Sequence, residues 1–151
     1  MLDDIDRRLL RYWQAEPTLG PGELAERAGL SQARAARRIA RMRDAGIVGG
    51  VGAVIDWTAL GYAVEVSLRI TLDKTQAGAF DAFLAAARKV PEVIEMQTFL
   101  GRVDVRLSVI ARDMAHYQQV YREGVLTLPH IADIEALMHV ARIKSQETLP
   151  L

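Results

Sequence analysis

The chain has 151 residues, of which half are hydrophobic and a quarter are charged, a composition that argues against intrinsic disorder. Nineteen basic residues balance nineteen acidic ones, so the chain as a whole is not basic, and the lack of cysteine excludes disulfides and thiolate metal sites. The N-terminal MLDDIDRR is charged from the start and does not resemble a signal peptide. No apolar run approaches the roughly 18 residues of a membrane span, so we expect a cytoplasmic protein without a membrane partner.

The first helix is predicted over residues 3–15. Ile5 and Leu9 recur at helical spacing, and the acidic residues at the start of the segment suit the positive end of a helix dipole. Pro17 and the Gly-Pro-Gly run at 20–22 end this helix, and a second helix is predicted to begin near Glu23.

The stretch LAERAGLSQARAARRIARM, residues 24–42, has the pattern of a helix-turn-helix. A short apolar helix reaches Gly29, which suits the tight turn, and Ser31 stands where the next helix needs an N-cap. In that helix Ala35, Ile39 and Met42 share one apolar face. We therefore expect the second helix of the motif to be the DNA-reading element.

A basic arc lies beside that apolar face and consists of Arg34, Arg37, Arg38 and Arg41. The span from Arg27 to Arg43 holds six arginines and no acid, whereas the chain as a whole is neutral. Positive charge gathered on one helix face is what binding to a phosphate backbone requires. A solvated basic face is the alternative interpretation.

Gly46 is the expected C-cap of the arginine helix. The glycine-rich stretch from Ile47 to Ile55 is predicted to form the wing of a winged helix, followed by a strand-like linker over 51–61. A nucleotide-binding loop is disfavoured because these glycines follow a helix and no helix comes after them. The first domain is accordingly predicted to span residues 1–50.

From Tyr62 the hydrophobic period changes from 3.6 to 2, which marks a second domain over 62–151. The predicted elements are a strand from about Val64 to Ile70, a helix over 74–89, strands over 93–99 and 103–111, a helix from Asp113 to about Leu126, and a strand over 131–144. In the first of these helices Phe80, Phe83, Leu84 and Ala87 are expected to face the core. The order βαββαβ predicts a ferredoxin-like α+β domain.

One face of this sheet has no helix left to cover it, and it is predicted to carry mostly polar side chains. A solvated face is one possibility. We favour packing against the sheet of a second copy, with charges paired across the interface. The expected residues are Glu65, Ser67, Arg69, Glu95, Gln97, Asp104, Arg106, Ser108, Glu135, Leu137 and His139.

Several strings in fixed order resemble the leucine-responsive and asparagine-responsive (Lrp/AsnC) family of transcriptional regulators. They are LDDIDRRLL at 2–10, ELAERAGLS at 23–31, RRIARMRDAGIV at 37–48, PEV at 91–93, GRVD at 101–104, Leu128-Pro129 and Ile143-Lys144. The resemblance implies an N-terminal winged helix-turn-helix, a βαββαβ effector domain that dimerises sheet to sheet, assembly of dimers into rings such as octamers, and an amino-acid pocket between dimers.

By the same resemblance, double-stranded DNA is contacted by Ser31, Gln32, Arg34, Arg37, Arg38 and Arg41, with base contacts near the helix start and phosphate contacts from the later arginines. The implied effector site comprises Leu100, Gly101, Arg102, Asp104, Met114, Leu137, Met138 and His139. Asp104 is the carboxylate suited to a ligand ammonium. The alternative is a turn carboxylate satisfied by backbone N–H groups.

Three residues depart from the family pattern. Leu100 stands where a small hydroxyl is usual, Val105 where an aromatic is common and Arg106 where an apolar residue is usual. Losing a hydroxyl removes a hydrogen-bond donor, so we expect an apolar or sulfur-containing amino acid to be preferred.

Two other functions stay open. Some relatives of this architecture are decarboxylases that act on haem precursors, yet no nucleophile–base motif or metal-ligand cluster occurs, and His116, His130 and His139 are scattered. No catalytic residue, metal or cofactor is therefore expected. An effector-independent protein that compacts DNA is the other alternative.

Overall fold

The computed structural model describes residues 2–145 and 148–151, and these form two compact units. The first unit runs as far as Val54 and also includes the described residues from Lys144 onward. The second unit is Ile55–Ile143. Within the described residues no helix is both long and apolar enough to cross a membrane.

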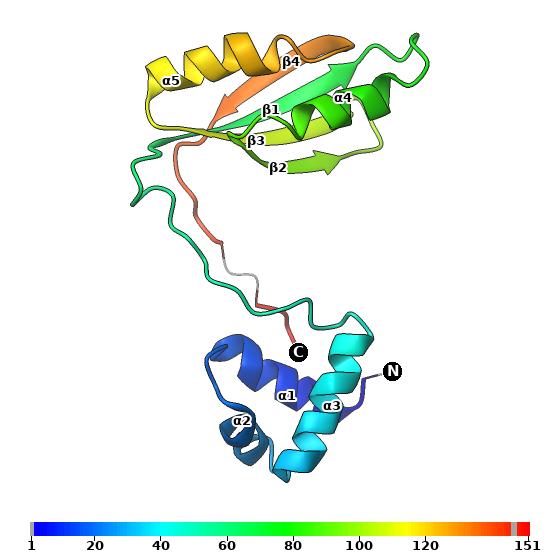
Figure 1. The fold of residues 1–151 in the computed structure, drawn as a ribbon, viewed down its shortest axis with the longest axis vertical. Coiled ribbons are helices and arrows are strands. Elements are labelled where there is room, and N and C mark those ends of the chain that lie inside the picture. The colour runs from blue at the N-terminus through cyan, green and yellow to red at the C-terminus, as the bar shows by residue number, and fades with distance from the viewer. Residues whose placement is uncertain (1, 146–147) are drawn as a thin grey trace. The chain divides into compact units, whose positions relative to one another are not determined.

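Three helices build the first unit: α1 (Asp4–Ala15), α2 (Pro21–Arg27) and α3 (Gln32–Asp44) (Figure 1). Their apolar faces meet in one core that contains Leu9, Leu24, Ala35, Ile39 and Met42. The face predicted for α3 is thus the face that is buried. The N-terminus of α1 is fixed by a capping box in which Asp6 N donates to Asp3 and Asp3 N donates to Asp6.

The two predicted glycine turns are confirmed. Gly29, between α2 and α3, and Gly46, after α3, both have a φ of +69°, where side chains with a Cβ are strained. Ser31 occupies the N-cap position of α3 with extended backbone angles, but its hydroxyl makes no capping hydrogen bond. The Ser31 hydroxyl is therefore not engaged in a hydrogen bond to the backbone at the start of α3.

The predicted wing is wrong. Residues 45–63 contain no β-strand and no helix. A wing needs two strands that pair with each other. This segment is a single glycine-rich run, with Gly50 at φ +150°, and glycine weakens a strand. The first unit is a helix-turn-helix of three helices, followed by an irregular segment.

The C-terminal residues lie against α1. The Gln14 side-chain amide donates to Leu149 O and accepts from Leu149 N, at 2.9 and 3.0 Å. Arg11 Nε donates to Leu151 O at 3.0 Å. Both ends of the chain therefore contribute to the first unit.

An antiparallel sheet in the order β2-β3-β1-β4 forms the second unit. Its strands are β1 (Val64–Leu72), β2 (Val93–Thr98), β3 (Val105–Ala111) and β4 (Ile131–Met138), and its helices are α4 (Ala79–Ala87) and α5 (Met114–Gln119), the latter continued by a π-helical turn over Val120–Val125. Both helices cover the same face of the sheet, which leaves the other face bare (Figure 1). The βαββαβ prediction is confirmed.

The core of this unit lies between the sheet and the two helices. Val66, Leu68 and Ile70 of β1 and Leu107 of β3 are fully buried there, with Phe83 of α4 packed on them. The prediction that Phe80 faces inward is wrong, because its side chain is 42% exposed. The reason is that α4 begins only at Ala79, so Phe80 lies in its first turn and lines an open pocket there.

Candidate DNA-binding surface and effector pocket

A shallow groove of about 180 Å³ on α3 is lined by the four arginines of the predicted basic arc, Arg34, Arg37, Arg38 and Arg41. The helix places them there because residues three and four apart share a face. The buried apolar stripe fixes the other side of α3 against α1 and α2. The structure therefore brings these four predicted residues together.

Two of the four arginines form ion pairs with α1. Arg38 Nη1 lies 2.8 Å from Asp6 Oδ1 and 2.7 Å from Asp3 Oδ2, and Arg41 Nη2 lies 2.5 Å from Asp6 Oδ2. The backbone N–H of Asp6 and the Arg38 guanidinium lower the pKa of Asp3 to about 2. Sequence reasoning missed these contacts because it assigned the early acids of α1 only to the helix dipole.

The two predicted contacts at the start of α3 are placed differently. Ser31 is exposed with its hydroxyl free of the helix cap. The side chain of Gln32 is directed back to α2, where its Nε2 lies 2.8 Å from the position that a Cβ on Gly22 would take. Gly22 therefore leaves the room that Gln32 occupies.

The predicted effector residues fall into two groups at opposite ends of the sheet. Leu100, Gly101 and Arg102 form the turn between β2 and β3, and Asp104 N donates to Ile70 O near the end of β1. His139 N donates to Glu65 O near the start of the same strand. Leu137 and Met138 pair with Ser67 and Val66 at that end, and Met114 follows β3 there. One chain by itself does not bring the two groups together.

Asp104 is buried and already has partners. One carboxylate oxygen lies 2.8 Å from Lys74 Nζ, and the other accepts from Leu72 N at 2.9 Å. The bonds from Lys74 and Leu72 N hold the pKa of Asp104 below its usual range against the opposing effect of burial. Lys74 was not predicted as a site residue, because a single lysine in a loop gives no sequence signal.

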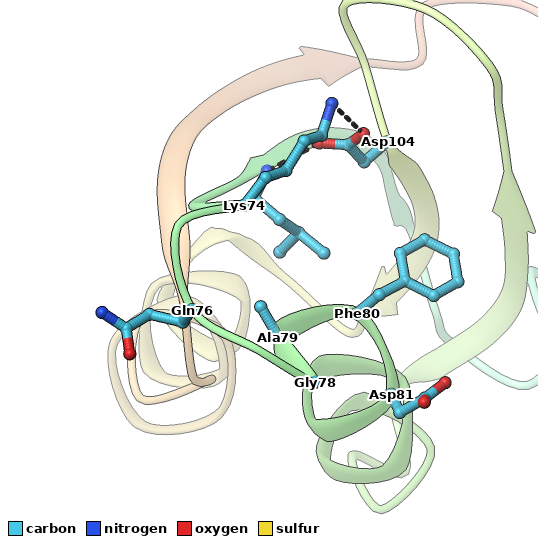
Figure 2. Close-up of a pocket in the computed structure, with 8 residues that line it drawn as sticks. Lys74, Gln76, Gly78, Ala79, Phe80, Asp81 and Asp104 are labelled. Carbon is cyan, nitrogen blue, oxygen red and sulfur yellow. Dashed lines mark hydrogen bonds and ion pairs between the residues drawn. The ribbon is translucent and has the colours of Figure 1, made fainter.

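A pocket of about 340 Å³ opens beside this ion pair, between the loop after β1 and the first turn of α4 (Figure 2). The lining combines one cation, one amide, carboxylates and apolar surface, which suits a small zwitterion better than a purely apolar ligand. The lining residues are Leu72, Lys74, Gln76, Gly78, Ala79, Phe80, Asp81 and Asp104. Of the predicted effector residues only Asp104 reaches this pocket.

Glu65 organises the other end of the sheet. It accepts from Arg142 Nη2 at 2.9 Å and from Ser108 Oγ at 3.3 Å, and His139 Nδ1 lies 3.3 Å away. The Arg142 guanidinium also stacks 5.5 Å from the centre of the Trp57 ring. Sequence analysis placed Glu65, Ser108 and His139 on one sheet face but did not name Arg142 or Trp57, because these two come from segments outside the strands.

A three-helix helix-turn-helix with a basic α3, joined to a βαββαβ unit with a small pocket, defines the class of one-component regulators that bind DNA and a small ligand. Two family models agree with this class. The AsnC-type helix-turn-helix domain matches residues 2–43, and the Lrp/AsnC ligand-binding domain matches residues 65–149. The chain belongs to the Lrp/AsnC family of transcriptional regulators.

Relatives of known role cover nearly the whole chain. The chain is 30% identical to a proline dehydrogenase transcriptional activator of Rhodobacter capsulatus over 98% of this chain and 96% of that protein. It is 29% identical to the leucine-responsive regulatory protein of Salmonella typhimurium over 98% and 90% of the two chains. These relatives are transcriptional regulators rather than enzymes.

Solved structures share the fold. A transcriptional regulator from Neisseria meningitidis in complex with L-Met aligns with a TM-score of 0.91 at 27% identity, over 99% of this chain and 97% of that chain. AsnC of E. coli aligns with a TM-score of 0.87 at 25% identity, over 97% of both chains.

Proposed function

We propose that this transcriptional regulator binds specific sites in double-stranded DNA through α3 and changes its DNA binding when an amino acid occupies the second unit. The observation that carries the proposal is the arginine-lined groove on α3, in a chain that is neutral overall. In a helix-turn-helix, exposed guanidinium groups on the second helix are suited to contact DNA phosphates. The start of α3 is exposed, and Ser31 there is suited to contact the edges of the bases.

For the effector we propose the pocket beside Asp104. Lys74 Nζ offers a counter-ion for an α-carboxylate, and Asp104 has lone pairs left for an α-ammonium beyond its two present bonds. Phe80 and Leu72 offer apolar surface to the ligand side chain. The pocket volume of about 340 Å³ lies at the lower end of the 300–1,000 Å³ typical of small-molecule sites.

We further propose that the bare face of the sheet packs on a second copy, and that dimers assemble further, up to octamers. Arg69 with Glu135 and Arg106 with Glu95 are paired on that face, and Arg106 Nε is buried without an acceptor among the described residues. Since one chain separates the turn at Leu100 from Met114 and Leu137–His139, both groups can line one site only when a second copy supplies one of them.

The DNA proposal is tested by selecting fragments of the source organism's genomic DNA with the purified protein, with and without a mixture of the common amino acids. A two-fold symmetric motif should be enriched, with half-sites about 10 base pairs apart or a multiple of that spacing. Enrichment should change when the amino acids are added. Random fragments in both samples would contradict the proposal.

The effector proposal is tested by titration calorimetry with single amino acids. L-Met and L-Leu should bind more tightly than L-Asn or L-Asp, because the pocket offers apolar surface. Lys74→Met should weaken binding at least tenfold, since a hydrogen bond to a charged group contributes about 1.5–3 kcal/mol. Lys89→Met, just after α4 and outside the pocket, is the matched control. Equal binding by both variants would place the effector elsewhere.

A further inference from the structure

Asp6 is a fully buried carboxylate at the contact between α1 and α3, with 0% of its side chain exposed. Charged groups are almost never buried completely unless they are paired. Oδ1 accepts from Arg38 Nη1 at 2.8 Å, and Oδ2 accepts from Arg41 Nη2 at 2.5 Å and from Asp3 N at 3.1 Å. Both carboxylate oxygens of Asp6 therefore accept hydrogen bonds from other groups of the protein.

Asp3 completes a cluster of four charges. Both of its carboxylate oxygens accept from Arg38 Nη1, at 2.9 and 2.7 Å. Two carboxylates thus face two guanidiniums, and the net charge of this cluster is zero. Arg34 and Arg37, which line the same groove, have no ion-pair partner in the part of the chain that the structure describes.

We propose that Asp6 is a positioning residue for DNA binding: together with Asp3 it holds and neutralises Arg38 and Arg41, so that Arg34 and Arg37 supply the phosphate contacts of the arc. This inference rests on the proposed DNA-binding function and changes the assignment within it. The four arginines that sequence analysis treated alike then divide into two that fix α3 on α1 and two that meet the nucleic acid.

Exposure and charge both support this division. The Arg38 side chain is only 19% exposed, so a phosphate reaches it only by separating it from two carboxylates. The Arg41 side chain is 59% exposed, but its Nη2 forms an ion pair with Asp6, which already balances its charge. The salt dependence of DNA binding reflects the number of phosphate charges that the protein newly neutralises, so balanced guanidiniums add little to it.

The test measures binding of the full-length protein to a mixed-sequence DNA duplex by fluorescence anisotropy between about 50 and 200 mM KCl. Arg34→Met and Arg37→Met should each reduce the slope of log K against log [salt] by about 0.9 for each phosphate that the variant no longer neutralises. The double variant Asp3→Asn/Arg38→Met removes one charge of each sign, and Asn is also a good N-cap, so its slope should equal that of the wild type.

The opposite pattern overturns the inference: a reduced slope for the double variant with an unchanged slope for Arg34→Met and Arg37→Met.

The variant Asp6→Asn should increase the slope instead of reducing it. It releases Arg41 from its ion pair, so the salt dependence of DNA binding should become steeper by about 0.9 for each further phosphate that is neutralised. A shallower or unchanged slope in a folded Asp6→Asn protein also overturns it. If Asp6→Asn does not fold, the slopes measured for the Arg34 and Arg37 variants and for the Asp3/Arg38 double variant still test the inference. A wild-type protein that binds no DNA would instead contradict the proposed function.

Discussion

At the scale of single residues, the buried acids determine which predicted contacts are free to meet a ligand. Asp104 was expected to receive a ligand ammonium, and the structure shows that Lys74 Nζ, another ammonium, already lies 2.8 Å from it. Its second oxygen holds the backbone N–H of Leu72 at the end of β1. Asp104 therefore fixes the rim of the pocket whether or not a ligand is present.

Asp104→Asn should lower the free energy of unfolding by about 1.5–3 kcal/mol at pH 7, because the variant lacks a charge-assisted hydrogen bond in a buried place. The pKa of Asp104 is lowered in the folded protein, so its stabilising effect is present above the unfolded pKa of about 3.9 and is lost as the pH falls through the folded value. The difference between wild type and variant, measured by urea unfolding, should shrink in acid. Asp133→Asn, at an exposed position on β4, is the control and should change stability by less than about 0.5 kcal/mol.

At the scale of elements, the helix-turn-helix depends on the left-handed turn at Gly29. The ideal Cβ of an alanine there would meet no atom within 4 Å, so the cost of a substitution comes from the backbone conformation alone. Sequence reasoning identified this turn because glycine is the residue that adopts a positive φ without strain.

Gly29→Ala should destabilise the first unit by about 1–2 kcal/mol, the cost of a left-handed residue with a Cβ. Fluorescence of Trp13 in a Trp57→Phe background reports unfolding of that unit. Gly52→Ala is the matched control, since Gly52 does not have a positive φ and has open space around its Cβ position. An equal effect of both substitutions would show that Gly29 is not held in the left-handed conformation.

At the scale of the whole molecule, the uncovered sheet face determines assembly. The covered face carries the buried apolar residues of β1 and β3, whereas the bare face carries ion pairs and the exposed Leu137. Antiparallel sheets can leave one face in water, so the fold alone does not require a partner. The feature that favours a partner is Arg106 Nε, which is buried and has no acceptor among the residues that the structure describes.

Sedimentation velocity at about 10 µM protein should show dimers or larger species. Leu137→Asp should shift the distribution toward monomer, because it places an additional acid in a face that already carries Glu135 and Glu95. Ala85→Asp, at an exposed position of α4 on the other side of the sheet, should leave it unchanged. A wild-type monomer would contradict both the proposed interface and a site shared between copies.

The sequence by itself determined the class of both units, the family and the order of the helices and strands, although the helix predicted over 74–89 begins only at Ala79 and the strand predicted over 131–144 ends at Met138. Local rules set these features: Leu9 and Ile39 recur at helical spacing, β1 alternates apolar and polar residues, and Gly29 and Gly46 mark turns. The prediction from sequence failed where an element needs a pairing partner elsewhere in the chain, as for the strands of the wing predicted over Ile47 to Ile55.

Only the tertiary structure decided the state of the charged groups. Asp6 meets Arg38 and Arg41 across more than thirty residues, and Asp104 meets Leu72 across a similar distance. No local pattern encodes such pairs, because they arise when separately specified elements pack and a buried carboxylate must find counter-charges. The family pattern likewise implies the turn at Gly101 and the residue His139 as parts of one site, but within one chain they lie beside opposite ends of β1.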